Sequence, residues 1–497
     1  MSAVDRNILT VIEPAIVLDE LAIPDFESGS DNQVGDGEPP MVEKGSKFST
    51  MIPLIRVNQY EIQGDRLEMF ELSCTGFYPT CRFSIYDRDG LFTARHYPKD
   101  GDIIQLNIRS QGEETTFKPI RIDFTIEDIK PMGGGGSTNS SSQLMISGRM
   151  HVPNLFTEKV QFQDNTSWNS LLSIAEELQL GYASNVEDTD DQQIWTNPYD
   201  TAYKFIQDIT SNSYLNDESF FTSYIDPYYY LTMVDVNKLF DNEDQDLEAV
   251  KAFSQNAPDT IGINDGGDSD FDAPYFLSSL TQYQGTANYI SKYQQINKSG
   301  QISKNNGYKR YTQYWDLEAK EFISEFVDPI VGDTPGMIPA TKGRLVQGEV
   351  EGPRNDQVKF KYLGTQGDNV HANYYYGSIL NYQNMQEIEK FGMELELDTV
   401  NPSIFRYSRI YVEIIETATN VKSVLTAPNN DDNVPEDAQR RQDKDPEVTA
   451  DKTSDTGIKN EYLSGFYVIT GIEYILTKPG GVRQRLHLRR REVVPTT

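Results

Sequence analysis

The sequence is poor in the residue types that form most catalytic and metal sites. Its 497 residues include two cysteines and four histidines. Cys74 and Cys81 are too few for a disulfide scaffold, and they flank a Gly-Phe-Tyr-Pro turn across which they could pair. We expect free, half-buried thiols instead. The histidines lack the spacing of metal ligands, so no metal site is predicted: His96, His151, His371 and His487.

Long apolar runs are also missing. No stretch approaches the roughly 18 apolar residues that a transmembrane helix needs, so no membrane insertion is expected. The chain starts with Asp5 and Arg6, and Glu13 and Asp19 break the apolar stretch that follows. A signal peptide has a basic start and an unbroken apolar run. The sequence therefore predicts a protein that folds in a cytoplasm.

Positive charge is scarce. The chain has 44 Lys and Arg against 76 Asp and Glu, which gives a formal net charge of −32 and a pI near 4.5. Such a chain repels nucleic acid and anionic lipid unless basic residues cluster locally. Aromatic residues are plentiful, with 29 Tyr and 23 Phe. Because these residues suit half-buried strands, the composition favours β structure.

Motifs of known enzymes are absent. Gly133–Gly136 lacks the Lys and the strand-to-helix context of a phosphate-binding loop. Asn264–Asp272 resembles a calcium loop but lacks its bidentate Glu, so a solvated acidic turn is favoured. No catalytic residue and no cofactor is predicted, although a carboxylate pair could hide among so many acidic residues. Three tryptophans could bind sugars, but their spacing favours a core role: Trp168, Trp195 and Trp315.

Two regions of the chain show strand patterns with the same order of parts. In the first, the strand Ile103–Ile108 precedes a closing hairpin of Phe117–Ile129 and Leu144–Val152. In the second, the strand Arg409–Ile415 precedes a closing hairpin, Phe466–Leu476 and Val482–Arg491. Apolar and polar residues alternate along these strands, which predicts one buried and one wet face. An internal duplication explains the shared order, and two unrelated antiparallel sheets are the alternative.

Helical patterns lie between the two strand regions. Apolar residues from Trp168 to Leu178 fall at helical spacing, and Gly181 can close that helix. A second helix is predicted to begin at Asn197-Pro198, with Asn as N-cap and Pro at the first helical position. Residues 220–236 then form a predicted hairpin that turns at Asp226-Pro227. The chain is therefore α+β, with strands dominant.

The order of these elements resembles the hub family of contractile tails. This family comprises the T-even-type baseplate hub, the late-control tail proteins of Mu-like and P2-like phages, and the base of type VI secretion spikes. One stretch, Gln161–Phe240, carries the phrase aromatic-x-x-Leu-Leu-x-Ile-Ala-x-x-Leu, a second helix from Tyr199 to Ile209 and a hairpin. The other comprises Gly465–Leu476 and Gly481–Glu492, on which family barrels end.

The resemblance implies a mainly β fold, with two tail-tube-like antiparallel β-barrels joined by a small α/β domain in a homotrimeric ring. The resemblance predicts a first barrel and allows the middle hairpin to belong to the second barrel, whereas the arm is predicted from a polar tract that cannot bury enough apolar area to offset its ordering entropy. The expected parts are the arm at 1–48, the first barrel at 49–155, the α/β domain with two short helices at 156–218, the hairpin at 219–240, an acidic linker and irregular middle region at 241–375, and the second barrel at 376–497 with a charged insertion at 427–460.

By this resemblance the chain is a structural virion component and not an enzyme. Three copies would present six barrels, which match a hexameric tail tube on one side and a trimeric central spike on the other. The expected partners are further copies, the spike, the tube or tube-initiator protein, the baseplate wedge proteins, and genome DNA that passes without specific binding during ejection. Carboxylates lining the channel would repel that DNA, while solubility explains the acidity equally well.

Assembly is expected in the bacterial host cytoplasm. The alternatives are a receptor-binding or fibre-like tail protein and a tail-associated cell-wall hydrolase.

The last strand carries an unusual basic strip. Its basic residues share one face by the period of two, and its apolar residues share the other. We expect ion pairs with an acidic neighbour, either in the chain's own barrel or in an adjoining subunit. The alternative is an exposed edge strand that charge protects from aggregation. The candidate subunit-contact residues are Arg483, Arg485, His487, Arg489 and Arg491.

Overall fold

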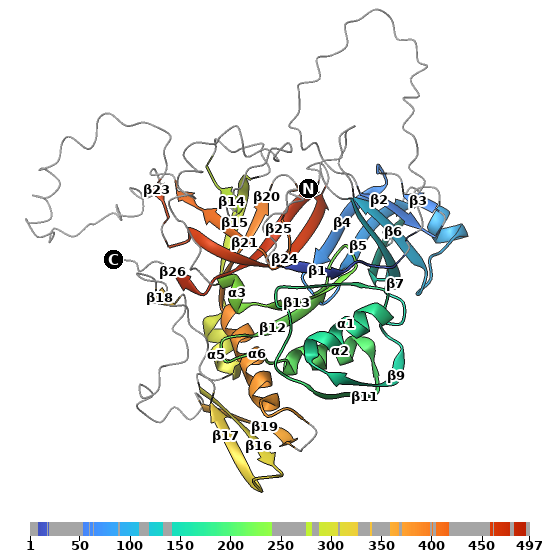
Figure 1. Cartoon of the computed structure of the whole chain (residues 1–497). Coiled ribbons are helices and arrows are strands. Elements are labelled where there is room, and N and C mark those ends of the chain that lie inside the picture. Colours follow the sequence, from blue (N-terminus) through green and yellow to red (C-terminus); the bar gives the residue numbers. More distant parts are fainter. Residues whose placement is uncertain are drawn as a thin grey trace, which may run out of the picture.

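The computed structural model shows a mainly β protein with few helices (Figure 1). The N-terminal arm falls largely outside the described residues, as do the predicted Gly133–Gly136 loop, the acidic turn Asn264–Asp272 and residues 427–457 of the charged insertion. The structure describes residues 8–16, 18, 53–58, 60–62, 64–87, 90–108, 119–132, 142–240, 275–280, 288–306, 309–326, 338–339, 358–366, 370–397, 400, 404–416, 458–460, 462–477 and 482–493.

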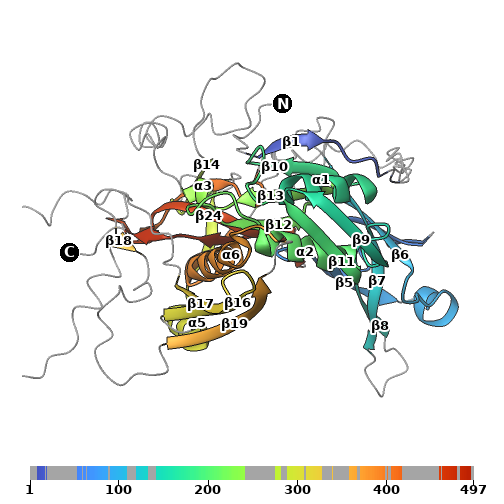
Figure 2. The same ribbon diagram turned by 60° about the horizontal axis from the view of Figure 1, so that its bottom comes forward.

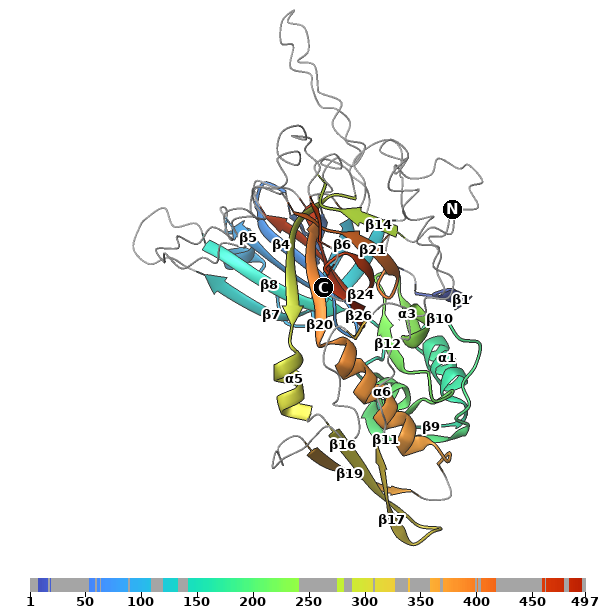
Figure 3. The same cartoon turned by 90° about the vertical axis from the view of Figure 1, so that its left-hand side faces the viewer.

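One large curled sheet dominates the molecule (Figure 3). Its strands follow the order β15-β20-β25-β24-β4-β5-β8-β7-β6-β2-β3, with β21 beside β24 and β14 beside β21. The first β region is β2 (Leu54–Val57), β3 (Tyr60–Ile62), β4 (Leu67–Cys74), β5 (Thr80–Asp87), β6 (Ile103–Ile108), β7 (Ile120–Met132) and β8 (Ser142–Met150). The second β region is β14 (Tyr275–Ser278), β15 (Ile290–Asn297), β20 (Phe391–Leu397), β21 (Arg409–Glu413), β24 (Gly465–Thr477) and β25 (Val482–Arg489).

The predicted alternation along these strands is confirmed. Ile104, Leu106 and Phe124 are buried in the core, whereas Gln105 and Asp123 lie between them at partly exposed positions. Each strand thus buries one apolar face, and burial of that face is the main force that holds the sheet in register.

The two β regions repeat one arrangement. In chain order, β4, β5, β6, β7 and β8 correspond to β15, β20, β21, β24 and β25, and both sets pair antiparallel in the spatial order first-second-fifth-fourth-third. The same two strands of each set carry a β-bulge. These irregularities lie at Leu67/Met69 and Ile126/Asp128 in the first region, and at Ile290/Lys292 and Ile469/Gly471 in the second. Because bulges fix register, their shared positions favour the duplication over two unrelated sheets.

An α/β region lies below the first β region (Figure 1). Its helices α1 (Ser167–Glu177) and α2 (Ala202–Asn212) pack with a sheet and a two-stranded ribbon. The sheet has the order β1 (Leu9–Ile12), β10 (Gly181–Ser184), β13 (Tyr230–Asp235) and β12 (Phe221–Ile225), and the ribbon is β9 (Glu158–Asn165) with β11 (Gln193–Thr201). The predicted first helix is confirmed.

The predicted hairpin with its turn at Asp226-Pro227 is also confirmed, as β12 and β13. Its strands hydrogen-bond within the four-stranded sheet and not within the large one. One side of the hairpin nevertheless packs on the second β region, where Tyr224 and Val234 join a cluster with Tyr407 and Val468. The hairpin therefore couples the α/β region to the large sheet.

The predicted start of the second helix is wrong. Strand β11 runs through Asn197-Pro198, and α2 begins four residues later with Thr201 as its N-cap, whose hydroxyl accepts from Lys204 N. The side chain of Asn197 instead bonds Asp200 through both its amide atoms, at 2.8 and 2.9 Å. These bonds close a bulge in β11, so Asn197 is used in a local turn and not as a cap.

The middle of the chain is more ordered than predicted. Helix α5 (Ser299–Asn306) follows β15, and a three-stranded sheet consists of β17 (Glu321–Phe326), β16 (Lys309–Asp316) and β19 (Val358–Gln366). Residues 374–388, where strand patterns were expected from 376, form helix α6 (Tyr374–Ile388). Figure 2 shows α6 between the large sheet and the three-stranded sheet.

The prediction failed at α6 because this helix buries amides, among them Asn381, Gln383 and Asn384, alongside its apolar residues. The short remaining elements are η1 (Leu91–Arg95), α3 (Asn237–Phe240), β18 (Ile338–Pro339) with β26 (Glu492–Val493), and β22 (Ile415–Glu416) with β23 (Ile458–Lys459).

Candidate functional site

The two β regions join where β24 pairs with β4. The antiparallel ladder runs from Ile472 opposite Cys74 to Thr477 opposite Met69. Ile472, Tyr474 and Leu72 are buried on one side of this junction. Glu473 and its partner Ser73 lie on the other side, because successive side chains in a strand point to opposite faces. The junction therefore makes the two regions one sheet with a continuous apolar face and a continuous polar face.

The basic strip lies on the polar face beside this junction. Strand β25 is bordered by β20 and β24, so the alternative of an exposed edge strand is wrong. Registers place Arg485 opposite Glu396 on β20 and opposite Glu473 on β24. We define the charged face as Glu394, Glu396, Glu473, Arg483, Arg485, His487 and Arg489.

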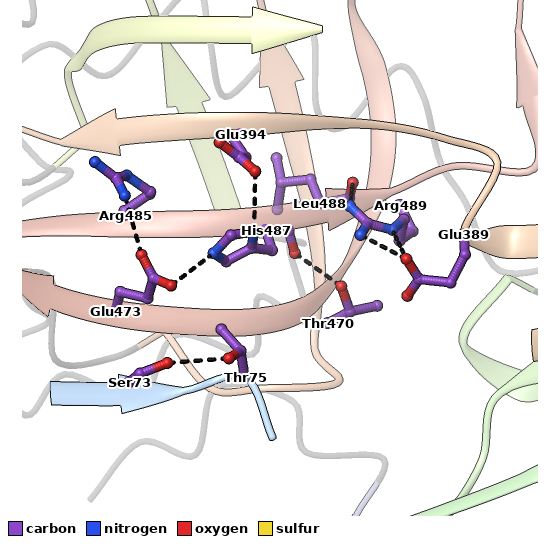
Figure 4. A network of polar contacts seen from close by, with 10 residues as sticks. All are labelled: Ser73, Thr75, Glu389, Glu394, Thr470, Glu473, Arg485, His487, Leu488 and Arg489. Atoms are coloured by element: carbon purple, nitrogen blue, oxygen red, sulfur yellow. Dashed lines mark hydrogen bonds and ion pairs between the residues drawn. The ribbon is translucent and has the colours of Figure 1, made fainter. Parts of the chain in front are cut away.

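The arginines of the charged face pair with carboxylates within the chain, and Figure 4 shows this for Arg485 and Arg489. Arg483 Nη1 lies 2.7 Å from Glu396 Oε1, and Arg485 Nη1 lies 3.2 Å from Glu473 Oε2. Arg489 donates from Nη2 and Nε to Glu389 Oε2, at 2.7 and 3.0 Å. Among the described residues, the acidic neighbour of the strip is thus the chain's own sheet and the end of α6.

His487 lies between two carboxylates at the centre of Figure 4. Its Nε2 is 3.3 Å from Glu473 Oε1, and its Nδ1 is 3.5 Å from Glu394 Oε1. The hydrogen bond and charge of His487, together with Arg485, lower the pKa of Glu473 against the opposing effect of burial. Burial also acts to raise the pKa of Glu396, but the bond from Arg483 and the charges of Lys292, Arg483 and Arg485 outweigh it and lower that pKa.

Arg491 departs from the predicted strip. Strand β25 ends at Arg489, and the alternation ends with it. Arg491 Nη1 donates to Asn237 Oδ1 at 2.7 Å and its guanidinium lies over the Phe240 ring, on α3. Its neighbour Arg490 is buried and donates to the carbonyl oxygens of Tyr462 and Ser464. The four remaining strip residues are the ones that the structure brings together.

The polar face continues across the junction onto the first β region. Registers connect Glu473 through Ser73 and Thr80 to Arg149 on β8. Arg149 Nη1 lies 3.0 Å from Glu127 Oε1. Arg149 on this half is therefore also paired with a carboxylate, and the face as a whole presents both signs of charge.

A groove separates the charged face from the α/β region and α6. Its lining includes Gly76, Asn381, Arg406, Glu473 and His487. Arg406 crosses the groove floor at the junction itself. Its Nε donates to Thr470 O at 2.6 Å, Nη2 donates to Thr75 O at 2.9 Å, and Nη1 donates to Gly76 O. The guanidinium also lies over the Tyr224 ring, 4.6 Å from its centroid.

The described residues contain few groups suited to catalysis. They hold no cluster of three or more potential metal ligands, and none of their helices is both long and apolar enough to span a membrane. Cys74 and Cys81 are free but fully buried, not half-buried as predicted. Burial raises the pKa of Cys74 to about 12 and that of Cys81 also. A thiol in this state is not a nucleophile at neutral pH.

The carboxylate partners of the strip were not singled out from the sequence, although a signal was present. Glu394 and Glu396 alternate with apolar residues in Met-Glu-Leu-Glu-Leu, and Glu473 sits alone within a strand of apolar and aromatic residues. A carboxylate repeating with the period of two on a strand predicts an acidic stripe. Arg406 carries no comparable signal, because its bonds join segments distant in sequence.

No family model matches the chain, and neither does any curated protein. Solved structures with a similar arrangement include the tail protein from Neisseria meningitidis MC58, at 10% identity and a TM-score of 0.45, covering 89% of this chain and 97% of that one. The 43 kDa tail protein of prophage MuSo2 from Shewanella oneidensis matches at 9% identity and a TM-score of 0.44, covering 90% and 100%. A chain of the half-lidded Francisella PdpA-VgrG complex matches at 10% identity and a TM-score of 0.39, covering 90% and 59%. Scores this low establish neither a family nor a function.

Proposed function

We propose that the chain is the baseplate hub of a contractile phage tail. Three copies form a ring that joins the hexameric tail tube to the trimeric central spike and lines the DNA channel. The role is structural and not enzymatic. The virion baseplate is its location, reached after assembly in the host cytoplasm, with tube or tube-initiator and wedge proteins as further partners.

The observation that carries the proposal is the duplicated β unit. Two equivalent sets of strands lie side by side in one sheet, joined between β24 and β4. A chain with two equivalent units gives six units as a trimer, so it can meet sixfold symmetry at one end and threefold symmetry at the other. A symmetry adapter between tube and spike requires this property.

The charged face supports a channel-lining role. Its arginines are each paired with a carboxylate of the same chain, and the chain as a whole carries a net charge of −32. Paired arginines attract phosphate weakly, because their charge is already compensated. Genome DNA would therefore pass such a face without binding. A subunit-contact role for the strip Arg483–Arg491 stays a prediction.

The fibre-like alternative finds less support. It predicts a repetitive β tail, whereas the last long strands, β24 and β25, lie inside the large sheet, between β20 and β4. The hydrolase alternative calls for a compact catalytic group, and no observation on the described residues favours one.

The mass of the purified full chain in solution tests the proposal. Light scattering over a range of concentrations should show a trimer, or a monomer that converts to a trimer as concentration rises. A dimer, a hexamer, or a monomer that persists at the highest concentration would contradict the proposed ring.

A further inference from the structure

The two equivalent units of the sheet differ at one place. In the second β region, one part of β24 pairs with β21 and the remainder, Ile472–Thr477, pairs with β4. In the first, β6 pairs with the corresponding early part of β7, Ile120–Thr125. From Glu127 onward, β7 pairs only with β8 among the described residues. In the part of the chain that the structure describes, this part of β7 therefore lacks the neighbour that its equivalent in β24 has.

The missing neighbour can be identified from the duplication. The strand that covers β24 is β4, and the equivalent of β4 is β15. Strand β15 is the last strand at the opposite end of the large sheet, and among the described residues no strand pairs with its outer edge. The two open edges thus correspond to the two sides of the junction already formed inside the chain.

We propose that β15 of one copy pairs antiparallel with the open part of β7 of a second copy, and repeats the β24–β4 junction between subunits. The bulges fix the register. Asp128 corresponds to Gly471, and Ile296 corresponds to Ser73. Lys130 is therefore the equivalent of Glu473. In the proposed contact Lys130 lies opposite Ile296 of the second copy, as Glu473 lies opposite Ser73 within the chain.

Exposure at the two edges agrees with the absence of a neighbouring strand among the described residues. Tyr293 on β15 is 40% exposed, while its equivalent Phe70 on β4 is 1% exposed. On β7, Pro131 is exposed, while its equivalent Tyr474 is 4% exposed. A second copy at these edges would cover side chains that the inner junction already covers.

Charge does not oppose this contact. The exposed run Lys292–Gln295 on β15 carries one positive charge and no carboxylate, although the chain as a whole is strongly acidic. Beside it would lie Lys130 and Asp128, which pair with each other on β7. The interface is head-to-tail, so repetition gives a ring of equivalent units when the rotation closes, and the proposed trimer requires that closure. The inference deepens the proposed function and rests on it for the number of copies.

Cysteine cross-linking in the full chain tests the register. Directly opposed residues in antiparallel strands have Cβ atoms about 4.5–5.5 Å apart, a range that approaches disulfide geometry. The double variant Lys130→Cys with Ile296→Cys should give covalent dimers and trimers on mild oxidation, and each single variant should not. Native Cys74 and Cys81 are buried and should not form cross-links.

Two controls make the result decisive. The pair Glu473→Cys with Ser73→Cys should link within one chain and report that the chemistry works at the inner junction. The pair Lys204→Cys with Ile296→Cys places one thiol on the exposed surface of α2 and should not link chains specifically. Unfolding midpoints of the Lys130→Cys, Lys204→Cys and Ile296→Cys variants should match the parent.

The outcomes separate this inference from the proposed function. Trimers in light scattering without a 130–296 link, while the inner control links, would overturn the junction and leave the ring standing. Monomers without a link would overturn both. A 130–296 link, identified by peptide mass, in a trimer would support both.

Discussion

Arg406 binds Thr470 at the junction of the two β regions, with Nε 2.6 Å from the Thr470 carbonyl oxygen. The same guanidinium donates to the carbonyls of Thr75 and Gly76, which follow β4. One side chain from the second β region thus holds β24 and the end of β4 together. The two equivalent units are fixed relative to each other at this point, and their relative position decides whether copies can close a ring.

Removal of this guanidinium should weaken the junction. Arg406→Ala leaves carbonyls without their charged donor, and we expect a loss of about 2–3 kcal/mol in the free energy of unfolding. Arg406→Lys should recover only part of the loss, since an ammonium cannot reach all the carbonyls in the same plane. Urea denaturation measures the effect. Arg82→Ala is the control, because Arg82 lies on the exposed face of β5 and should change stability little. If Arg406→Ala and Arg82→Ala lowered the free energy of unfolding equally, Arg406 would not hold the junction together.

Gly392 allows β20 and β25 to approach closely beside the charged face. A Cβ at this position would lie 2.1 Å from Leu488 O. We expect Gly392→Ala to cost about 1–3 kcal/mol through displacement of the backbone. Gly300→Ala on α5, where the added Cβ meets nothing within 4 Å, should be neutral or slightly stabilising. Thermal unfolding of both variants checks the difference, and a neutral Gly392→Ala would contradict the close approach.

The charged face should make stability depend on pH in acid. The pKa of Glu473 is lowered from its ordinary value of 4.5 in the folded state. The folded state therefore binds fewer protons there, and the stabilisation is fully present above that ordinary value and is lost as pH falls through the lowered one. The parent chain should therefore unfold at a higher urea concentration than Glu473→Gln, and this difference should shrink below about pH 4.5.

Glu127→Gln is a matched control for this titration. Its partner Arg149 and its own side chain are 31% and 45% exposed, so solvent screens the pair and the substitution should change stability little. A constant difference between the parent and Glu473→Gln from neutral to acid pH would show that the ionised carboxylate does not contribute as proposed.

The strand content was predictable because its signal is local. Alternation along Ile103–Ile108 and Val482–Arg489 reports one buried face, whatever the partners are. Helix α6 was missed because its stability comes from distant segments. Asn381 accepts from Phe221 N at 2.9 Å and donates to Ser213 O at 2.9 Å. A buried amide that joins distant segments leaves no periodic pattern in its own sequence.

The basic half of the candidate site was predictable because its signal is local, whereas its acidic half was not. The period of two placed Arg483, Arg485, His487 and Arg489 on one face, as the structure has them. Their partners Glu396 and Glu473 depend on which strands flank β25, and this is set by the order of a large sheet. That order brings Arg483 to Glu396, 87 positions away, and it is fixed by burial of the apolar face as a whole.

Removal of carboxylates from the charged face should create DNA affinity. The parent chain should not bind a short linear duplex at physiological salt, since its arginines are paired and its net charge is −32. The triple variant Glu394→Gln, Glu396→Gln and Glu473→Gln should bind it weakly, and added salt should abolish the binding. Fluorescence anisotropy measures both.

A matched triple variant controls for the change in net charge. Asp316→Asn, Glu318→Gln and Glu321→Gln remove the same number of carboxylates around the turn between β16 and β17, away from the charged face. This variant should not bind the duplex. If the parent chain bound the duplex tightly, or if both triple variants bound it equally, the carboxylates of the charged face would not be what prevents DNA binding.

An electron cryo-microscopy map of the assembled full chain tests the central claim most directly. The account predicts six equivalent β units around one channel, with Glu473, Arg485 and His487 facing the axis and β15 of each copy beside β7 of the next. A map in which the charged face points away from the axis, or in which the copies meet through other edges, would contradict it.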